Sequence, residues 1–263
     1  MADPEVKPAM PVKPAMPVKT EIASHRGGAL VWPENSPTAF RNTAALPVEQ
    51  VEFDVHPTTD GRLAVFHDPT LERTSDGTGP IAGYSWDELQ RFALKGTEGE
   101  RMPSLEDVIA TFRPTAIKLR LEIKPDHERR PYPQSPAMVA AVLAAEGVLD
   151  RTTVTSFQVE TLAALLRHAA PLGTIWILSN YVMTDVGIAG AIRTAQLHGI
   201  PALSVHRTML TADVVKTVRD AGLGIGGFAV NEEADIRRMF ELGVDVFTTD
   251  RPDRAVAIRA ALG

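Results

Sequence analysis

Short apolar runs alternate with longer amphipathic stretches along the chain, from residue 22 to the C-terminus. The expected strands lie at 22–24, 51–55, 119–123, 153–155, 174–178, 202–205, 224–230 and 244–248. The expected helices lie at 37–45, 138–145, 160–169, 186–198, 212–221, 232–242 and 254–262. Short strands that alternate with helices indicate βα units and parallel pairing. Eight strands are enough to close a ring, so the pattern predicts an α/β fold, the (β/α)8 TIM barrel.

The segment 59–103 interrupts this alternation. It carries turn signals at Asp60-Gly61 and at 76–80, and it has little long helical periodicity. We therefore expect an insertion after the second strand. An extra apolar run, Leu63–Phe66, lies inside the segment, and the pattern leaves open whether it belongs to the barrel wall or to the insertion. The expected single domain at 21–263 thus has eight or nine strands.

The first 20 residues differ from the rest, because the unit Val-Lys-Pro-Ala-Met-Pro occurs at Val6 and again at Val12. Proline at this density blocks helices and sheet ladders, so we expect a disordered Pro-rich tail. No stretch approaches the roughly 20 apolar residues that span a bilayer, so no transmembrane segment is expected. The absence of a recognisable signal peptide favours a cytoplasmic location.

Composition narrows the classes of function. The 263 residues are 44% hydrophobic and 23% charged, which is ordinary for a globular protein. The formal net charge is −6 and no run of Lys and Arg stands out, so no nucleic-acid partner is expected. The chain has no cysteine, which excludes disulfides, thiolate metal sites and cysteine nucleophiles. An anionic small molecule would have to be bound by a metal ion or by a few placed cations.

Carboxylates lie at the ends of two expected strands. Side chains alternate along a strand, so Glu52 and Asp54 share one face, and Glu122 and Lys124 share one face of the next barrel strand. Carboxylates held together in an apolar strand repel one another unless a cation neutralises them. Hard oxygen ligands suit Mg²⁺ or Ca²⁺, so we interpret Glu52, Asp54 and Glu122 as metal ligands. The alternative for Glu122 and Lys124 is a structural ion pair in the barrel core.

Histidines supply candidate proton-transfer groups. His25 and Arg26 follow the first strand. A histidine there can exchange protons near neutral pH, and an arginine can bind a phosphate through two parallel hydrogen bonds. His67 follows the extra apolar run. Cleavage of a phosphodiester needs one group that takes a proton and another that donates one, and these two histidines can fill the roles. A structural or turn role is the alternative for each, and His206 is a further pocket candidate.

Several motifs resemble, in identity and order, those of the glycerophosphodiester phosphodiesterases. They are His25-Arg26-Gly27, Pro33-Glu34-Asn35-Ser36, Glu52-Phe53-Asp54, His67-Asp68-Pro69, Leu121-Glu122-Ile123-Lys124, Thr155-Ser156-Phe157 and Thr248-Thr249-Asp250-Arg251-Pro252. The resemblance extends from about residue 22 to the C-terminus. It implies a barrel with a small insertion, one divalent cation, and hydrolysis of glycerophosphodiesters to glycerol 3-phosphate and an alcohol.

By position, the resemblance also implies a set of roles. The metal ligands would be Glu52, Asp54 and Glu122, the acid–base pair His25 and His67, the phosphate-binding residues Arg26 and Lys124, and the supporting residue Glu34. One position departs from the family, because many members have Trp where this chain has Phe228. Phe228 keeps an aromatic ring but lacks the indole N–H, which puts the fit of the glycerol moiety or of the leaving alcohol in question.

Two other functions compete with this interpretation. A lysophospholipase D would need an apolar surface for an acyl chain, and the insertion offers Ile81, Tyr84, Trp86, Leu89 and Phe92. The helical spacing of the last three instead indicates packing onto the barrel. A catalytically silent phosphate-binding barrel would lack the acid–base residues, yet both histidines are present. The sequence leaves open the headgroup, the choice of Mg²⁺ or Ca²⁺, attack by water or by the glycerol hydroxyl, and the oligomeric state.

Overall fold

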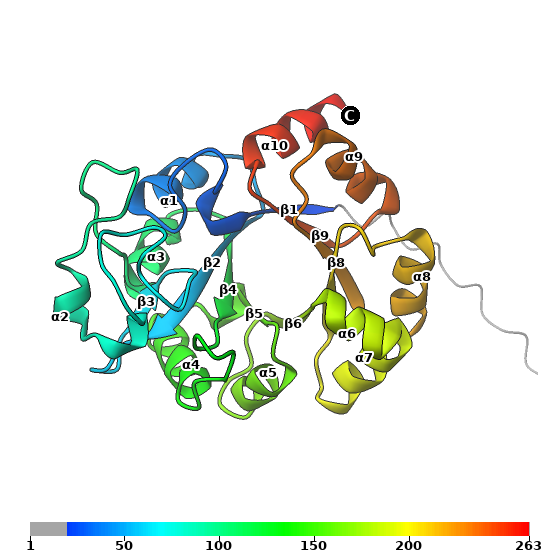
Figure 1. Cartoon of the computed structure of the whole chain (residues 1–263). Helices are drawn as coiled ribbons and strands as arrows, with labels where there is room; N and C mark the ends of the chain where they lie inside the picture. The colour runs from blue at the N-terminus through cyan, green and yellow to red at the C-terminus, as the bar shows by residue number, and fades with distance from the viewer. Residues whose placement is uncertain (1–19, 263) are drawn as a thin grey trace, which may run out of the picture.

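A closed ring of parallel strands forms the centre of the protein (Figure 1). The computed structural model describes residues 20–262, so the predicted tail lies outside the described residues except for Thr20. In ring order the strands are β1 (Glu21–Ser24), β2 (Gln50–Pro57), β4 (Lys118–Ile123), β5 (Thr152–Ser156), β6 (Gly173–Leu178), β7 (Ala202–His206), β8 (Gly224–Phe228) and β9 (Val246–Thr249). Because β1 pairs with both β2 and β9, the ring closes and the predicted (β/α)8 barrel is confirmed.

Helices surround this ring (Figure 1). They are α1 (Pro37–Ala44), α3 (Leu105–Phe112), α4 (Ser135–Ala145), α5 (Val159–Leu166), α6 (Asn180–Asp185), α7 (Gly187–Leu197), α8 (Ala212–Asp220), α9 (Glu233–Leu242) and α10 (Pro252–Ala261), with single turns at η1 (His25–Gly27) and η3 (Leu149–Arg151). Within residues 20–262, none of these helices combines the length and apolar character needed to cross a bilayer.

The main hydrophobic core lies between the strands and the helices. Phe53 of β2 packs edge to face against Phe40 of α1, with ring centroids 6.0 Å apart, and Phe40 makes a similar contact with Phe112 of α3. The side chain of Phe53 therefore points out of the ring. Since side chains alternate along a strand, Glu52 and Asp54 share one face, as the sequence predicted, and that face points into the ring.

The insertion after β2 forms a second, smaller core. Its strand β3 (Leu63–Val65) runs antiparallel to the end of β2, which is the one ring strand it pairs with, so the run Leu63–Phe66 belongs to the insertion and not to the ring. The insertion also contains η2 (Ile81–Gly83) and α2 (Trp86–Leu89). Its buried apolar residues are Ala64, Phe66, Leu71, Ile81, Leu89, Leu94 and Met102.

The helical spacing of Trp86, Leu89 and Phe92 does mark a packed face. Leu89 is buried in the core of the insertion, and Trp86 and Phe92 pack against that same cluster. The expected partner was the barrel, whereas these side chains lie with the insertion's own apolar residues. The segment is long enough to enclose a small core of its own, in which Leu89 is buried and Trp86 and Phe92 are half-buried.

Candidate active site

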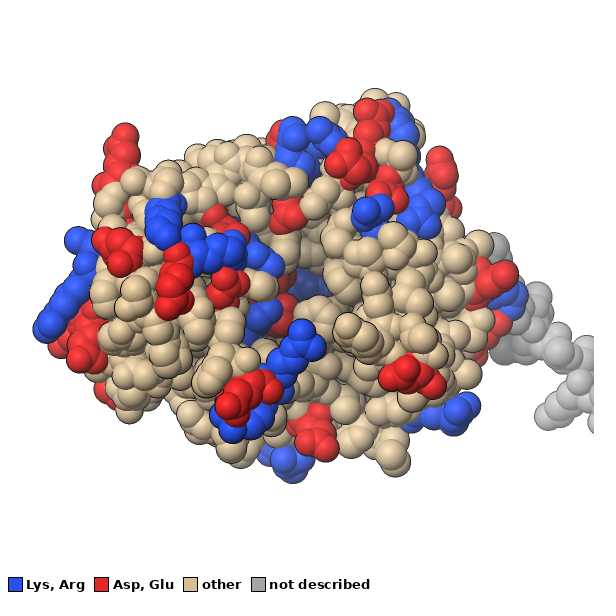
Figure 2. Space-filling model, in the orientation of Figure 1, with Lys and Arg blue, Asp and Glu red and all other residues tan. Residues whose placement is uncertain are grey.

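The candidate residues gather at the carboxyl ends of the strands, where Figure 2 shows acidic and basic side chains around and within a central hollow. Strand register explains how they meet. Asp54 of β2 is in register with Glu122 of β4, and Ser24 of β1 is in register with Thr249 of β9. Residues that directly follow paired positions, such as His25 and Asp250, are therefore brought together.

Three carboxylates form the centre of the site. Glu52, Asp54 and Glu122 are each at most 4% exposed, and they offer carboxylate oxygens that all lie within 4.8 Å of one another. Oδ2 of Asp54 accepts a hydrogen bond from Asn35 at 2.9 Å, whereas the buried Oδ1 accepts none. A buried oxygen without a hydrogen bond, beside two further carboxylates, fits the donor set that a hard divalent cation requires.

Electrostatics within this trio favour a bound cation. Burial, together with the charge of Asp54, raises the pKa of Glu52 to about 7. Burial also acts to raise the pKa of Asp54, but the charges of Lys124, His67 and Arg26 outweigh it and the pKa falls below its usual range. Asp54 thus keeps its negative charge while Glu52 more readily holds a proton. A divalent cation would relieve the repulsion between the two carboxylates.

Lys124 and Arg26 supply positive charge beside the trio. Nζ of Lys124 donates to Glu122 at 2.8 Å and lies 3.4 Å from Asp54. The guanidinium of Arg26 donates to Glu34 at 3.0 Å, and its Nε lies 3.5 Å from Asp54. The ion pair of Glu122 with Lys124, which was the alternative to their roles in binding, is present, but both residues also line the cavity at the barrel mouth.

The turn that carries Arg26 has an unusual backbone. Arg26 has a φ of 50°, and Gly27 and Gly28 follow at 76° and 96°. A Cβ at Gly27 would lie 2.7 Å from Cβ of Ala39, so only glycine fits there. The left-handed conformation costs a residue such as Arg26 about 1 kcal/mol. In this conformation the backbone N–H of Arg26 donates a hydrogen bond to Glu52 at 3.1 Å.

Each candidate catalytic histidine is held by an aspartate. Nδ1 of His25 lies 2.5 Å from Asp250, whose other oxygen accepts a hydrogen bond from Asn231 at 2.7 Å. Nδ1 of His67 lies 2.6 Å from Asp68. Because ionised carboxylates only accept hydrogen bonds, Nδ1 of each ring carries the proton and Nε2 is free for proton exchange. Nε2 of His25 lies 3.8 Å from Glu52, which places it beside the carboxylate trio.

The two histidines differ in basicity. Burial lowers the pKa of His25, but the charge of Glu52 and the hydrogen bond to Asp250 outweigh burial, and the pKa is raised. Burial lowers the pKa of His67, and the opposing charge of Asp54 does not compensate for it.

Arg73 connects the insertion to the barrel. Its Nε donates to Asp68 at 2.6 Å, and its two terminal nitrogens donate to Glu34 at 2.8 and 2.7 Å. One guanidinium thereby fixes both the aspartate that holds His67 and the glutamate that holds Arg26. Glu34, which the sequence predicted to support the site, thus accepts hydrogen bonds from two arginines.

Four polar residues of the site received no role from the sequence: Asp68, Arg73, Asn231 and Asp250. Asp68 and Asp250 each follow the end of a strand within a quoted motif, so the rule that selected His25 could also have selected them. Asn231 directly follows the strand expected at 224–230, so the same rule could have selected it too, whereas Arg73 carried no such signal because its role depends on contacts across the fold. Arg120 was also missed. It is 2% exposed inside the ring, and burial lowers its pKa to about 10 although Glu52 opposes this.

Two connected cavities open at this site. An inner cavity of about 250 Å³ is lined by both histidines, Glu52, Glu122 and other residues of the centre. An outer cavity of about 790 Å³ extends toward the loops after β4, β5 and β6. His67, Glu122, Lys124, Phe157 and Phe228 line both. His206 lies at the outer cavity, with its ring centroid 5.2 Å from that of Phe228.

The mouth of this closed TIM barrel holds a carboxylate trio, the positively charged side chains of Arg26 and Lys124, and two histidines bound to aspartates. This combination defines a metal-dependent phosphoric diester hydrolase. Residues 25–254 match the glycerophosphoryl diester phosphodiesterase family, and the chain belongs to that family. It is 33% identical to a glycerophosphodiester phosphodiesterase of Bacillus altitudinis, over 91% of this chain and 98% of the relative.

Solved structures agree with this assignment. A crystal structure from Agrobacterium tumefaciens strain C58, provisionally described as a glycerophosphoryl diester phosphodiesterase, has 37% identity and a TM-score of 0.90, and the match covers 92% of this chain and 98% of that one. A phosphodiesterase of Oleispira antarctica, solved with the product sn-glycerol-3-phosphate, shares the fold with 23% identity and a TM-score of 0.80, over 92% of this chain and 96% of that one.

Proposed function

We propose that this protein hydrolyses glycerophosphodiesters to glycerol 3-phosphate and an alcohol, with Mg²⁺ or Ca²⁺ bound by Glu52, Asp54 and Glu122. The observation that carries the proposal is the placement of two histidines, each oriented by an aspartate, on one cavity with Glu52 and Glu122 of the buried carboxylate trio. When bound, the cation would polarise a phosphoryl oxygen and lower the pKa of a coordinated hydroxyl.

Arg26 and Lys124 bind the phosphate in this proposal. Both line the inner cavity and both are held by carboxylates, so their charges are fixed before substrate arrives. Fixed charges of this kind stabilise the charge that develops on phosphoryl oxygens without reorganising during the reaction.

The cavities suggest how the histidines divide their roles. His67 lines both cavities, whereas His25 lines only the inner one. If glycerol occupies the inner cavity, His25 takes the proton from the attacking hydroxyl, which is either the glycerol 2-hydroxyl or water. His67, with a proton on both ring nitrogens, then donates the Nε2 proton to the alkoxide that departs toward the outer cavity, and its ring becomes neutral. Glu52 is the main charge that raises the pKa of His25, and a cation on this carboxylate would cancel that effect, so the assignment rests on geometry.

The test is release of glycerol 3-phosphate from glycerophosphocholine, glycerophosphoethanolamine and glycerophosphoinositol. The protein is treated with EDTA and then assayed with Mg²⁺, with Ca²⁺ or without metal. We expect cation-dependent release that Glu52→Ala abolishes and Glu241→Gln, at an exposed position of α9, leaves unchanged. No release from any substrate with either metal would refute the proposal.

Lysophosphatidylcholine serves as the comparison substrate. The apolar residues of the insertion that would have formed a surface for an acyl chain are buried or packed in its own core. We therefore expect slower turnover of lysophosphatidylcholine than of glycerophosphocholine, and faster turnover would replace this proposal with lysophospholipase D activity.

A further inference from the structure

The outer cavity has a larger volume than the smallest leaving alcohols would fill. Its volume of about 790 Å³ is three times that of the inner cavity, and it falls in the range of about 300–1,000 Å³ that binds complete small-molecule ligands. A phosphodiester held between Arg26 and Lys124 must direct its two substituents to different sides. The inner cavity suffices for glycerol, so the outer cavity receives the departing alcohol.

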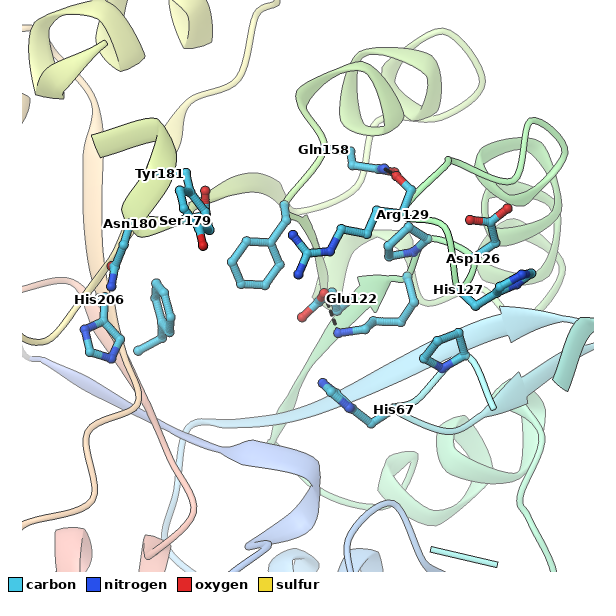
Figure 3. Close-up of a pocket in the computed structure, with 15 residues that line it drawn as sticks. His67, Glu122, Asp126, His127, Arg129, Gln158, Ser179, Asn180, Tyr181 and His206 are labelled. Carbon is cyan, nitrogen blue, oxygen red and sulfur yellow. Dashed lines mark hydrogen bonds and ion pairs between the residues drawn. The ribbon is translucent and has the colours of Figure 1, made fainter. Parts of the chain in front are cut away.

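The outer cavity has an excess of unpaired positive charge. Two carboxylates line it, and both are already paired: Glu122 with Lys124, and Asp126 with the side chain and backbone N–H of Arg130. The guanidinium of Arg129 also lines the cavity, and it forms no hydrogen bond or ion pair with any residue of the described part of the chain. Figure 3 shows this side chain projecting into the cavity toward Glu122.

The backbone aims Arg129 into this space. The residue has a φ of 62°, a left-handed conformation that is unfavourable for arginine. A tight turn enforces it, because the N–H of Arg129 donates to Asp126 and the N–H of Asp126 donates to Arg130, both at 2.9 Å. Gln158, from the loop after β5, donates to the carbonyl of Arg129 at 2.7 Å. Strain retained at the edge of an active site suggests a role for the side chain that it directs.

The remaining wall combines aromatic rings with hydrogen-bonding groups. Phe157 and Phe228 pack edge to face with centroids 5.9 Å apart, which gives one apolar side. Ser179, Asn180 and Tyr181, at the start of α6, line the opposite region in Figure 3. Hydroxyl and amide groups of this kind recognise the hydroxyls of a polyhydroxylated alcohol.

We propose that Arg129 is a specificity-determining residue that selects leaving alcohols carrying an anionic group, a phosphate or a carboxylate, on a polyhydroxylated or similarly polar frame. The inference rests on the proposed glycerophosphodiesterase function. The planar guanidinium binds both kinds of anion through two parallel hydrogen bonds. The same charge repels the ammonium of choline or ethanolamine, so these headgroups are disfavoured.

Two matched pairs of substrates test the inference and separate the two anions. Glycerophosphoinositol 4-phosphate differs from glycerophosphoinositol by a phosphate, and glycerophosphoserine differs from glycerophosphoethanolamine by a carboxylate. In at least one pair we expect kcat/KM of the wild-type protein to favour the more anionic member on the order of tenfold. Arg129→Gln should reduce that ratio to near one, and Arg129→Lys should retain part of it.

The control is Arg167→Gln, which removes the same charge directly after α5 at a residue that lines neither cavity. It should keep the wild-type ratios. Wild-type ratios near one in both pairs, or ratios that Arg129→Gln leaves unchanged, would overturn the inference while leaving the proposed function intact. Failure of the wild-type protein to cleave any of the four substrates, with glycerophosphocholine still cleaved, would overturn the inference alone, and failure with all five substrates under Mg²⁺ and Ca²⁺ would overturn both.

Discussion

Replacing Glu52 with glutamine should stabilise the metal-free protein while removing its response to divalent cations. Glu52 is 3% exposed, and burial together with Asp54 raises its pKa from an ordinary 4.5 to about 7. The folded, metal-free protein therefore holds a proton on Glu52 in a pH range where the unfolded chain has released it.

The size and sign of the effect follow from this difference in proton binding. A shift from 4.5 to about 7, at about 1.36 kcal/mol for each pKa unit, corresponds to roughly 3 kcal/mol. The stabilising contribution is fully present below pH 4.5 and is lost as pH rises to 7, because the folded state binds the extra proton in that window. Glutamine at position 52 keeps the shape without the charge, so this loss should be absent from the variant.

Urea unfolding of EDTA-treated protein at pH 5 and pH 8 measures the effect. Relative to wild type, Glu52→Gln should gain about 2.5 kcal/mol in unfolding free energy between pH 5 and pH 8, because part of the full effect falls below pH 5. Added Mg²⁺ or Ca²⁺ should stabilise the wild-type protein and have little effect on the variant. Glu241→Gln, at an exposed position, should behave as wild type in both respects.

The reasoning would be refuted by a variant that follows the wild-type pH dependence. The first outcome would mean that the buried charge of Glu52 does not destabilise the fold. A variant that keeps the full stabilisation by cations would also refute the reasoning, because Glu52 would then not be a metal ligand.

Three further predictions address the histidines and their supports. His67→Asn should lower the rate of glycerol 3-phosphate release on the order of 100-fold or more while leaving urea unfolding nearly unchanged, and a near-normal rate would exclude acid–base catalysis by His67. Asp250→Asn should move the ionisation of His25 in the pH–rate profile to lower pH, because burial already lowers this pKa and the variant removes an interaction that raises it; an unmoved profile would contradict the contact. Arg73→Gln should lower kcat by about tenfold or less with little change in KM, because Arg73 contacts Asp68 and Glu34 rather than substrate; a change confined to KM would place Arg73 on the substrate instead.

Strand periodicity predicted the ring well, because most of its strands are short, buried and flanked by amphipathic helices. The strand expected at 51–55 is β2 at Gln50–Pro57, and that expected at 119–123 is β4 at Lys118–Ile123. Helix α3 was missed because it directly follows the irregular insertion. Its signals were present nonetheless: Ser104 and Asp107 form a capping box, and its apolar positions recur at helical spacing.

The insertion was harder to interpret, for a physical reason. Apolar periodicity reports that a face is buried but not which surface covers it. The spacing of Trp86, Leu89 and Phe92 was therefore read correctly as packing and assigned to the wrong partner. Nothing in the sequence gave the size of the second core, which depends on how the turns of the segment fold back.

The same limit applies to the active site, and strand register explains it. Alternation along one strand suffices to place Glu52 beside Asp54 on an inward face. Glu122 joins them only because β2 and β4 pair with Asp54 opposite Glu122. His25 meets Asp250, 225 positions away in the chain, only because β1 and β9 close the ring with Ser24 opposite Thr249. Residue type and strand position thus identified the chemistry, whereas the partners that orient it depend on the register between strands, which single-strand periodicity does not contain.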